Sequence, residues 1–200
     1  MLLALDIATT TGWCAGRGDT LPDAGIVRIP STGQELGPYF DFFFRWLHAK
    51  ITELQEESGI QTEPGTFGPR CIDRDDLKIV FEAPILPESR YDSATGKWVK
   101  QTNLATTRKL QGLAGFVEAI ACQRNCLCEE VMLSTVKKAV GGSGRADKAD
   151  MVSAARRCGL PVETHDAADA FGVWIVMVRT YARQYQQFWD QKLYGPRSMI

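Results

Sequence analysis

Hydrophobic and polar positions form short blocks over the first part of the chain and then follow a helical spacing. Apolar runs at residues 2–6, 11–17 and 25–29 are separated by Gly, Asp and Pro, which predicts three strands joined by antiparallel hairpins. From residue 39 to residue 57 apolar side chains recur every three or four positions, and this period predicts a long helix that Gly59 ends. The chain therefore begins with strands and changes to helix.

The middle of the chain alternates between strand and helix patterns. Residues 61–76 are rich in Gly, Pro and charge and are expected to form a surface loop, after which the apolar run 77–84 predicts another buried strand. The polar, glycine-containing segment 88–102 is expected to be a loop. A helix pattern over residues 104–120 and a strand at about 126–133 follow.

The last part of the chain has helical patterns. A short segment at residues 134–140 leads through the glycine-rich GGSGR into a helix at 146–159, and a final long helix begins near residue 165. This order of elements predicts an α/β fold with a mixed five-stranded central sheet and helices on both faces. The carboxyl ends of strands and the start of a helix then share one rim of the sheet.

The composition fits one globular domain, since 44% of the 200 residues are hydrophobic. The 23 basic and 24 acidic residues give a net charge of -1, so any nucleic-acid or membrane partner must be met by a local patch. No apolar run approaches the roughly 20 residues of a membrane span, and the N-terminus lacks the regions of a signal peptide. We therefore expect a cytoplasmic protein without a membrane partner.

The six cysteines show no disulfide framework for a chain of this length, and a reducing compartment keeps them as thiols. Cys122, Cys126 and Cys128 have the spacing CxxxCxC. This spacing is either a weak metal-ligand pattern or a set of small buried side chains at a helix end and in the strand after it.

Carboxylates stand where the apolar patterns predict buried strand ends and a helix start. Asp6 and Glu82 each end a predicted buried strand, where an uncompensated charge costs roughly several kcal/mol, so a cation or an unusual proton is expected nearby. Asp166 and Asp169 are three positions apart and project from one face of the last long helix. A structural alternative for this pair is a helix start, with Thr164 or Asp166 as the N-cap and an acid favoured by the helix dipole.

The four acids together favour a metal site, because they are expected at one rim and no Lys or Arg adjoins them in sequence. Carboxylate oxygens are the ligands that Mg²⁺ and Mn²⁺ prefer. Two such ions about 3.5–4 Å apart can activate a water and stabilise the leaving oxygen of a phosphoryl displacement. The sequence therefore predicts a hydrolytic metallonuclease that uses Mg²⁺ or Mn²⁺, with two ions in each active site.

Four blocks of the sequence also resemble a known family. LALDIATTTGW, IVFEAP, STVKKAVGGSGRADK and HDAADAF are similar, in order and spacing, to the RuvC-type Holliday junction resolvases of the ribonuclease H-like superfamily, over nearly the whole chain. The resemblance implies a ribonuclease H-like fold and a metal-dependent homodimer that binds four-way DNA junctions. It implies paired nicks that leave 5′-phosphate and 3′-hydroxyl ends. The added loop and tail resemble bacteriophage or prophage versions, which would act in the host cytoplasm.

The resemblance implies a role for each acid. Asp6 matches the acid of the first strand, Glu82 that of the fourth strand, and Asp166 and Asp169 the acid pair of the last helix. Asp6 would bridge both ions, while Glu82 and Asp169 complete their shells. Asp166 would hold or orient the second ion and its water.

Basic residues of the glycine-rich block match the family as well. Lys137 and Lys148 correspond to basic residues near the scissile phosphate, and one of them, Lys148 foremost, would offset charge on the phosphorane. Lys138 and Arg145 are neighbours that would add to DNA binding, and GGSG lets the backbone approach a phosphate. The alternative is a solvated charged turn before a helix.

The chain departs from the family after Glu82, where APILPE lacks the aromatic wedge that some members carry. In the segment that follows, Arg90, Tyr91 and Trp98 combine charge with rings that could stack on an unpaired base, and the alternative is a flexible loop with a packed Trp. His165 is either a proton carrier or an exposed residue without a role.

One domain with a short C-terminal extension is expected from this resemblance. Residues 1–180 would form the nuclease domain, and residues 181–200 a helical extension beyond the shorter core of the family. We expect the extension to pack on its own domain or at the dimer contact rather than to bind DNA.

Other functions stay open at this point. Actin-like and sugar-kinase-like ATPases share the ribonuclease H-like core, and DIATTTG is near their phosphate-binding turn, but such proteins need two copies of the core. A degenerate fold would bind branched DNA without cutting it. A branched-DNA or flap nuclease of the same fold would lack strict junction specificity, because selectivity depends on dimer geometry.

Overall fold

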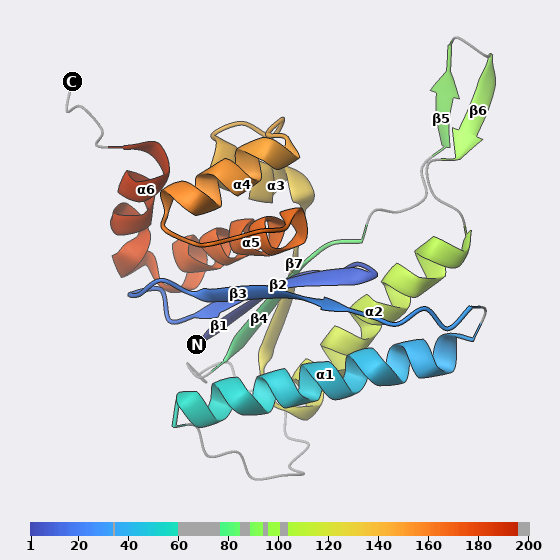
Figure 1. Ribbon diagram of the computed structural model, residues 1–200, viewed down its shortest axis with the longest axis horizontal. Helices are drawn as coiled ribbons and strands as arrows, with labels where there is room; N and C mark the ends of the chain where they lie inside the picture. Colours follow the sequence, from blue (N-terminus) through green and yellow to red (C-terminus); the bar gives the residue numbers. More distant parts are fainter. Residues whose placement is uncertain (34, 60–76, 85–88, 94–95, 101–103, 196–200) are drawn as a thin grey trace.

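The computed structural model describes all residues except 34, 60–76, 85–88, 94–95, 101–103 and 196–200 (Figure 1). The strands are β1 (Leu2–Asp6), β2 (Thr10–Gly16), β3 (Asp23–Arg28), β4 (Lys78–Glu82), β5 (Ser89–Asp92), β6 (Lys97–Lys100) and β7 (Leu127–Val131). The helices are α1 (Leu36–Glu57), α2 (Leu104–Gln123), α3 (Leu133–Gly141), α4 (Lys148–Arg157), α5 (His165–Tyr181), the 3₁₀ turn η1 (Arg183–Tyr185) and α6 (Gln186–Tyr194).

The central sheet has five strands in the order β3-β2-β1-β4-β7. The hairpins β1–β2 and β2–β3 are antiparallel, whereas β4 runs parallel to both β1 and β7. Helices α1 and α2 cover one face, and α3, α4, α5 and α6 lie on the other (Figure 1). The predicted mixed five-stranded sheet with helices on both faces is therefore confirmed.

The alternation of side chains along the central strands divides the core into two layers. Leu3, Leu5, Ile79 and Phe81 pack toward α1 and α2, while Leu2, Ala4 and Val80 belong to the layer under α5. Successive side chains in a strand point to opposite faces. The residues at even positions of β1 and β4 therefore face α5, and this parity extends to the last residue of each strand.

The segment 88–102, expected to be a loop, instead contains the strands β5 and β6. They pair antiparallel, with Ser89 opposite Lys100 and Asp92 opposite Lys97, and form a hairpin that projects from the body of the molecule near the start of α2 (Figure 1). Backbone pairing across a turn requires no buried face, so the polar sequence did not indicate it. The loop expected at residues 61–76 lies outside the described residues.

Helix ends agree with the predicted signals at two points. Gly59, with φ +69°, follows the end of α1, and Gly142, with φ +72°, caps α3 in the left-handed region that glycine favours. The segment from residue 133 is thus a full helix rather than a short connection. No helix among the described residues is long and apolar enough to cross a membrane.

Helix α6 packs on the domain that precedes it. The Trp189 indole is buried and donates a hydrogen bond to the Gly18 carbonyl at 2.7 Å, and the Lys192 ammonium donates to the Cys158 carbonyl at 3.2 Å. The described part of the extension is thus held to the β2–β3 connection and to the end of α4. The domain boundary at residue 180 stays a prediction.

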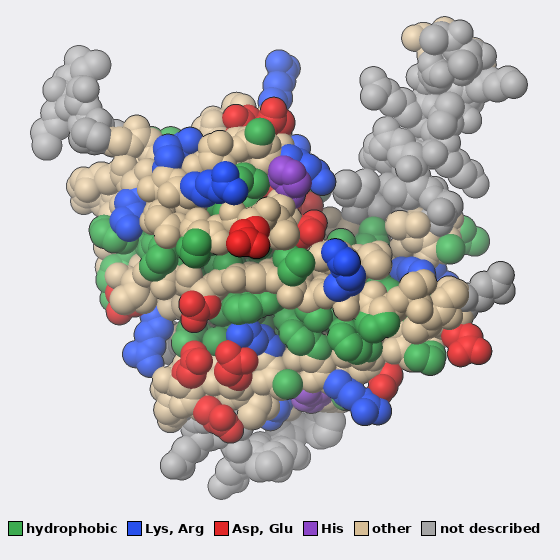
Figure 2. Space-filling view, in the orientation of Figure 1, with side chains coloured by type: hydrophobic (Ala, Val, Ile, Leu, Met, Phe, Trp, Pro, Cys, Tyr) green, Lys and Arg blue, Asp and Glu red, His purple; other side chains and the backbone are tan. Residues whose placement is uncertain are grey.

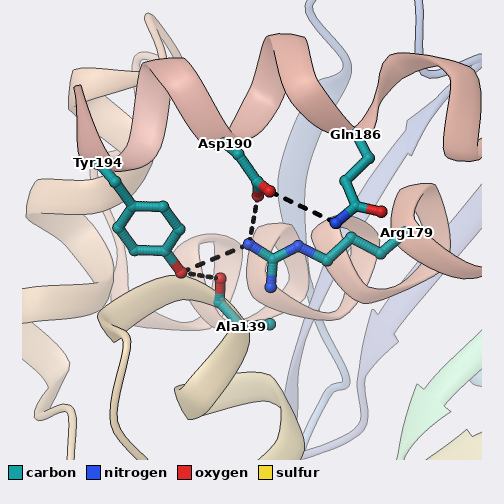
Figure 3. A network of polar contacts seen from close by, with 5 residues as sticks. All are labelled: Ala139, Arg179, Gln186, Asp190 and Tyr194. Atoms are coloured by element: carbon teal, nitrogen blue, oxygen red, sulfur yellow. Dashed lines mark hydrogen bonds and ion pairs between the residues drawn. The ribbon is translucent and has the colours of Figure 1, made fainter. Parts of the chain in front are cut away.

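A network of polar contacts joins α6 to α5 and α3 (Figure 3). The Arg179 guanidinium lies 2.6 Å from Asp190 Oδ1 and 3.4 Å from the Tyr194 hydroxyl. The Tyr194 hydroxyl donates to the Ala139 carbonyl at 2.5 Å, in the last turn of α3. Since the side chains of Arg179 and Asp190 are only 24% and 13% exposed, water screens their attraction weakly.

Replacing Arg179 with Met is expected to lower the free energy of unfolding by about 1–3 kcal/mol, because the cation that neutralises a largely buried carboxylate is lost. Urea unfolding monitored by circular dichroism measures the loss. The matched control is Arg45→Met, which removes an ion pair to Asp41 with side chains 77% and 54% exposed. It should cost no more than about 0.5 kcal/mol, and equal losses in the two variants would contradict the assignment.

Candidate active site

The two strand-ending carboxylates lie side by side at one rim of the sheet. In the parallel pair β1–β4, Leu5 lies opposite Phe81, and Asp6 and Glu82 follow them as the last residues of their strands. Their parity in the strands directs both side chains to the face covered by α5. The expected meeting of these two acids at one rim is therefore observed.

The start of α5 brings the second pair of acids to the same rim. Thr164 is the N-cap, and its hydroxyl accepts a hydrogen bond from the backbone N–H of Ala167 at 3.3 Å. Of the two N-cap candidates the structure thus selects Thr164, which leaves the carboxylate of Asp166 in the first turn without a capping role. Asp169 follows almost one turn later, on the same side of the helix.

The turn after Asp6 is fixed by a buried threonine. Thr11 is fully buried, and its hydroxyl donates to the Ala8 carbonyl at 2.8 Å. Its neighbour Gly12 pairs with Asp6 in the β1–β2 ladder and lies beneath the first turn of α5. Gly12 was not predicted to belong to the site, although a glycine inside a predicted strand often marks a close backbone approach.

The pKa values of the acids record how closely they lie. Burial, followed by the charges of Glu82, Asp169 and Asp166, raises the pKa of Asp6 to about 8, against the opposing effect of Lys148. Burial and the charge of Asp169 raise the pKa of Glu82 to about 7. Burial also raises the pKa of Asp169, against the opposing effect of Lys148.

Within the described ranges, none of these four side chains has a hydrogen bond or an ion pair to another residue of the protein. Nor do three His, Cys, Asp or Glu side chains in this part of the chain stand close enough together to hold a metal ion. The four acids are therefore near enough to repel one another, but their side chains are not yet close enough together to coordinate one ion. Four partly buried oxygen donors with no protein cation bound to them suit a hard divalent ion.

Two of the predicted basic residues flank the acids. Lys137 in α3 lowers the pKa of Glu82, and Lys148, the first residue of α4, lowers that of Asp6. The segment between them includes the exposed Lys138 and Arg145. On the face shown in Figure 2, Lys and Arg side chains gather over the layer of α3, α4 and α6, whereas acidic side chains gather over one end of α1.

The start of α4 is held in place by its own side chains. Asp147 accepts from the backbone N–H of Asp150 at 2.9 Å, and the Asp150 side chain accepts from the backbone N–H of Asp147 at 2.9 Å. This reciprocal capping box fixes the position from which Lys148 extends.

The remaining candidates are three residues of the hairpin, which lie apart from the acids, and His165, which lies beside them. Arg90 and Tyr91 are in β5 and Trp98 is in β6, with Tyr91 opposite Trp98 in the backbone register of the hairpin. The orientation of these side chains lies outside what the structure describes. His165 is exposed at the first position of α5, next to Asp166.

The cysteine pattern has the properties of ordinary thiols. Among the described residues, Cys122 and Cys128 are free thiols, and Cys122 is exposed at the end of α2. Burial, followed by the nearby charge of Glu118, raises the pKa of Cys128 to about 12. A thiol with so high a pKa keeps its proton near neutral pH, whereas metal ions bind thiolates.

Solved structures that share this fold include two of RuvC. A structure of Thermus thermophilus RuvC superposes with a TM-score of 0.55 and 19% identity, over 92% of this chain and 95% of that chain. A second, T. thermophilus RuvC in complex with a Holliday junction substrate, gives a TM-score of 0.55 and 14% identity, over 92% and 96% of the two chains. The α/β fold is therefore that of RuvC and the ribonuclease H-like proteins. No protein-family model and no curated protein sequence matches the chain.

In EDTA, Asp6→Asn is expected to raise the free energy of unfolding at about pH 8. Asp6 has a pKa of about 8 in the folded chain against an ordinary value of 3.8, so between these values unfolding releases a proton and becomes easier as the pH rises. Below about pH 4 both states are protonated and the group contributes nothing. The wild type should therefore lose stability from about pH 4 to about pH 8, and the variant should lose less.

Urea unfolding of both proteins at about pH 5 and about pH 8 measures this difference. The control is Glu56→Gln, which neutralises an exposed acid of α1 and should leave the pH dependence of the wild type unchanged. An Asp6→Asn variant less stable than the wild type at about pH 8 would contradict the assigned pKa.

Proposed function

We propose that this protein is a DNA endonuclease that resolves four-way junctions, as a homodimer, by paired metal-dependent hydrolysis of phosphodiesters. The products would carry 5′-phosphate and 3′-hydroxyl ends. The observation that carries the proposal is the set of four acids at one rim of a RuvC-like fold, with a strongly raised pKa at two of them. Raised pKa values caused by burial together with like charges are typical of active sites.

The donor set supports Mg²⁺ or Mn²⁺ as the cofactor, with two ions in each site. Such ions, when bound, supply an activated water and stabilise the charge of the leaving oxygen. Asp6 would hold the ions from the centre of the acid group, since the charges of Glu82, Asp169 and Asp166 all raise its pKa. Glu82 and Asp169 would complete the shells, and Asp166 would hold the second ion and orient its water. The positive charge of bound ions would also offset the repulsion between the four carboxylates.

The basic residues would hold the DNA backbone and offset the charge that develops on the scissile phosphate. Lys148 lowers the pKa of Asp6 and Lys137 lowers that of Glu82, so both are close enough to offset charge on the scissile phosphate. The exposed Lys138 and Arg145 would bind neighbouring phosphates, which the GGSG turn allows to approach closely. Arg90, Tyr91 and Trp98 of the hairpin would contact unpaired bases at the branch point.

T. thermophilus RuvC in complex with a Holliday junction substrate is among the solved structures of similar fold. This likeness supports branched DNA as the substrate class for the present chain. A nuclease that cuts branched or flapped DNA without strict junction specificity is the second candidate, because the same acids would serve it.

The test incubates the protein with an end-labelled four-way junction and with a linear duplex of the same sequence, in Mg²⁺, Mn²⁺ or EDTA. Paired nicks confined to the junction, absent in EDTA, are the expected result. Asp6→Asn should lower cleavage by about 10²-fold or more, the range observed when a group that stabilises transition-state charge is removed. Junction binding by the variant should stay near that of the wild type, since phosphate neutralisation elsewhere supplies the affinity.

The matched control is Glu163→Gln, which neutralises an exposed acid just before the N-cap of α5 and should cut at the wild-type rate. Equal cutting of junction and duplex would replace the resolvase by a general nuclease. Tight junction binding without cutting by the wild type would favour a binding module. Cleavage by Asp6→Asn at the wild-type rate would overturn the assignment of the site.

A further inference from the structure

The contact between β2 and the first turn of α5 is unusually close at Gly12. A Cβ atom added to this buried residue would lie 1.9 Å from the carbonyl oxygen of Asp166, 2.4 Å from its carbonyl carbon and 3.1 Å from the nitrogen of Ala167. These are backbone atoms, so no change of rotamer can relieve the overlap. Any side chain at position 12 must therefore move the start of the helix or the strand beneath it.

Gly12 is needed for space and not for an unusual backbone conformation. Its φ is not among the positive values, whereas Gly18 and Gly142 have φ of +102° and +72°. Alanine could adopt the backbone conformation of a strand at this position without strain. Glycine is therefore needed at this position because only a residue without a side chain lets the α5 backbone lie so close to the sheet.

A second glycine, in α5 itself, shows a different situation. A Cβ at Gly172 would lie 2.6 Å from Met151 Cε and 2.7 Å from Val136 Cγ1, both at the ends of side chains. Such atoms can turn aside at a cost in packing. Among the described glycines, Gly12 is the one at which an added atom meets the backbone of α5.

The position of this contact connects it to the acids. Gly12 is the register partner of Asp6 across β1–β2. The carbonyl group that lies against Gly12 belongs to Asp166, the first member of the acid pair in α5. The depth at which the helix lies on Gly12 thus fixes how far Asp166 and Asp169 reach toward Asp6 and Glu82.

We infer that Gly12 is a positioning residue of the proposed metal site, setting the distance between the acids of the sheet and those of α5. The inference rests on the metal site of the proposed function and adds a residue that touches neither metal nor DNA. Ordinary contact begins at 3.4 Å, so an alanine would lie about 1.5 Å too close to the Asp166 carbonyl. Oxygen ligands of Mg²⁺ lie at about 2.0–2.1 Å with near-ideal geometry, which leaves little tolerance for such a displacement.

The test measures the midpoint of metal binding in the absence of DNA. Thermal unfolding of wild type and Gly12→Ala is followed over a series of Mg²⁺ and of Mn²⁺ concentrations, and the concentration of half-maximal stabilisation is compared. We expect this midpoint to rise at least about tenfold in Gly12→Ala, the effect typical of losing a group that orients metal ligands. Junction binding in EDTA should change less than about threefold.

Gly172→Ala serves as the control for packing damage, because it adds the same atom to the same helix away from the acids. It should lower the melting temperature without changing the metal midpoint. Equal midpoints in Gly12→Ala and the wild type would overturn the inference. Equal shifts of the metal midpoint in Gly12→Ala and Gly172→Ala would also overturn it, since a general loss of stability would then explain both shifts.

A compensating substitution tests the distance itself. In the wild type, Asp169→Glu adds a methylene to an acid at fixed spacing and should raise the metal midpoint. In Gly12→Ala it should lower the midpoint, because the longer side chain spans the added distance. The sign of the effect therefore reverses between the two backgrounds. The same direction in both would contradict the inference.

If Gly12→Ala does not fold, Asp169→Glu alone decides the question. A helix held at a fixed depth cannot adapt to the longer acid, so an unchanged midpoint would overturn the inference and a raised one would support it. A wild type that binds metal but cuts no DNA would reject the proposed nuclease and leave this test valid. The two failures are therefore distinguishable.

Discussion

The burial of α5 between the central sheet and the outer helices is the constraint on which the rest of the structure depends. Its residues from Ala167 to Val178 are buried on nearly all sides, against β1, β2 and β4 below and against α3, α4 and α6 above. Burial of apolar surface contributes roughly 25 cal/mol per Å² and fixes the helix in one position. Both ends of the helix are thereby fixed as well, with the acid pair at one end and Arg179 near the other.

The acid end of α5 is held in place against its own electrostatics. Asp6 and Glu82 have raised pKa values because burial and like charges disfavour their ionised forms. A fold selected for stability alone would separate these groups or pair each with a cation. Apolar packing of the helix and hydrogen bonding of the strands outweigh the repulsion, and local rules are most often broken in this way at functional sites. The opposite end is different, since Arg179 and Asp190 attract each other there.

Basic and acidic side chains gather in different places on the surface, although the net charge of the chain is only -1. Basic side chains gather over the layer of α3, α4 and α6 (Figure 2). This layer covers the face of the sheet to which Asp6 and Glu82 point. Acidic side chains gather over one end of α1, which covers the opposite face (Figure 2). On the face in this view, a polyanion would be attracted to the basic group more than to the acidic one, and beyond the Debye length of about 8 Å salt would screen that attraction.

The sequence by itself determined the strands that end in Asp6 and Glu82 and the helix that begins before Asp166. These features follow from local periodicity, which records which side of an element is buried. The face to which the two strand-ending acids point was decided by the packing of the strands against α5. Only the tertiary structure decided that β4 lies beside β1, that Thr164 caps α5 and that residues 88–102 contain a hairpin. Strand partners, the choice between two caps and the depth at which α5 lies on Gly12 depend on contacts between segments far apart in the chain, and no local pattern records those distances.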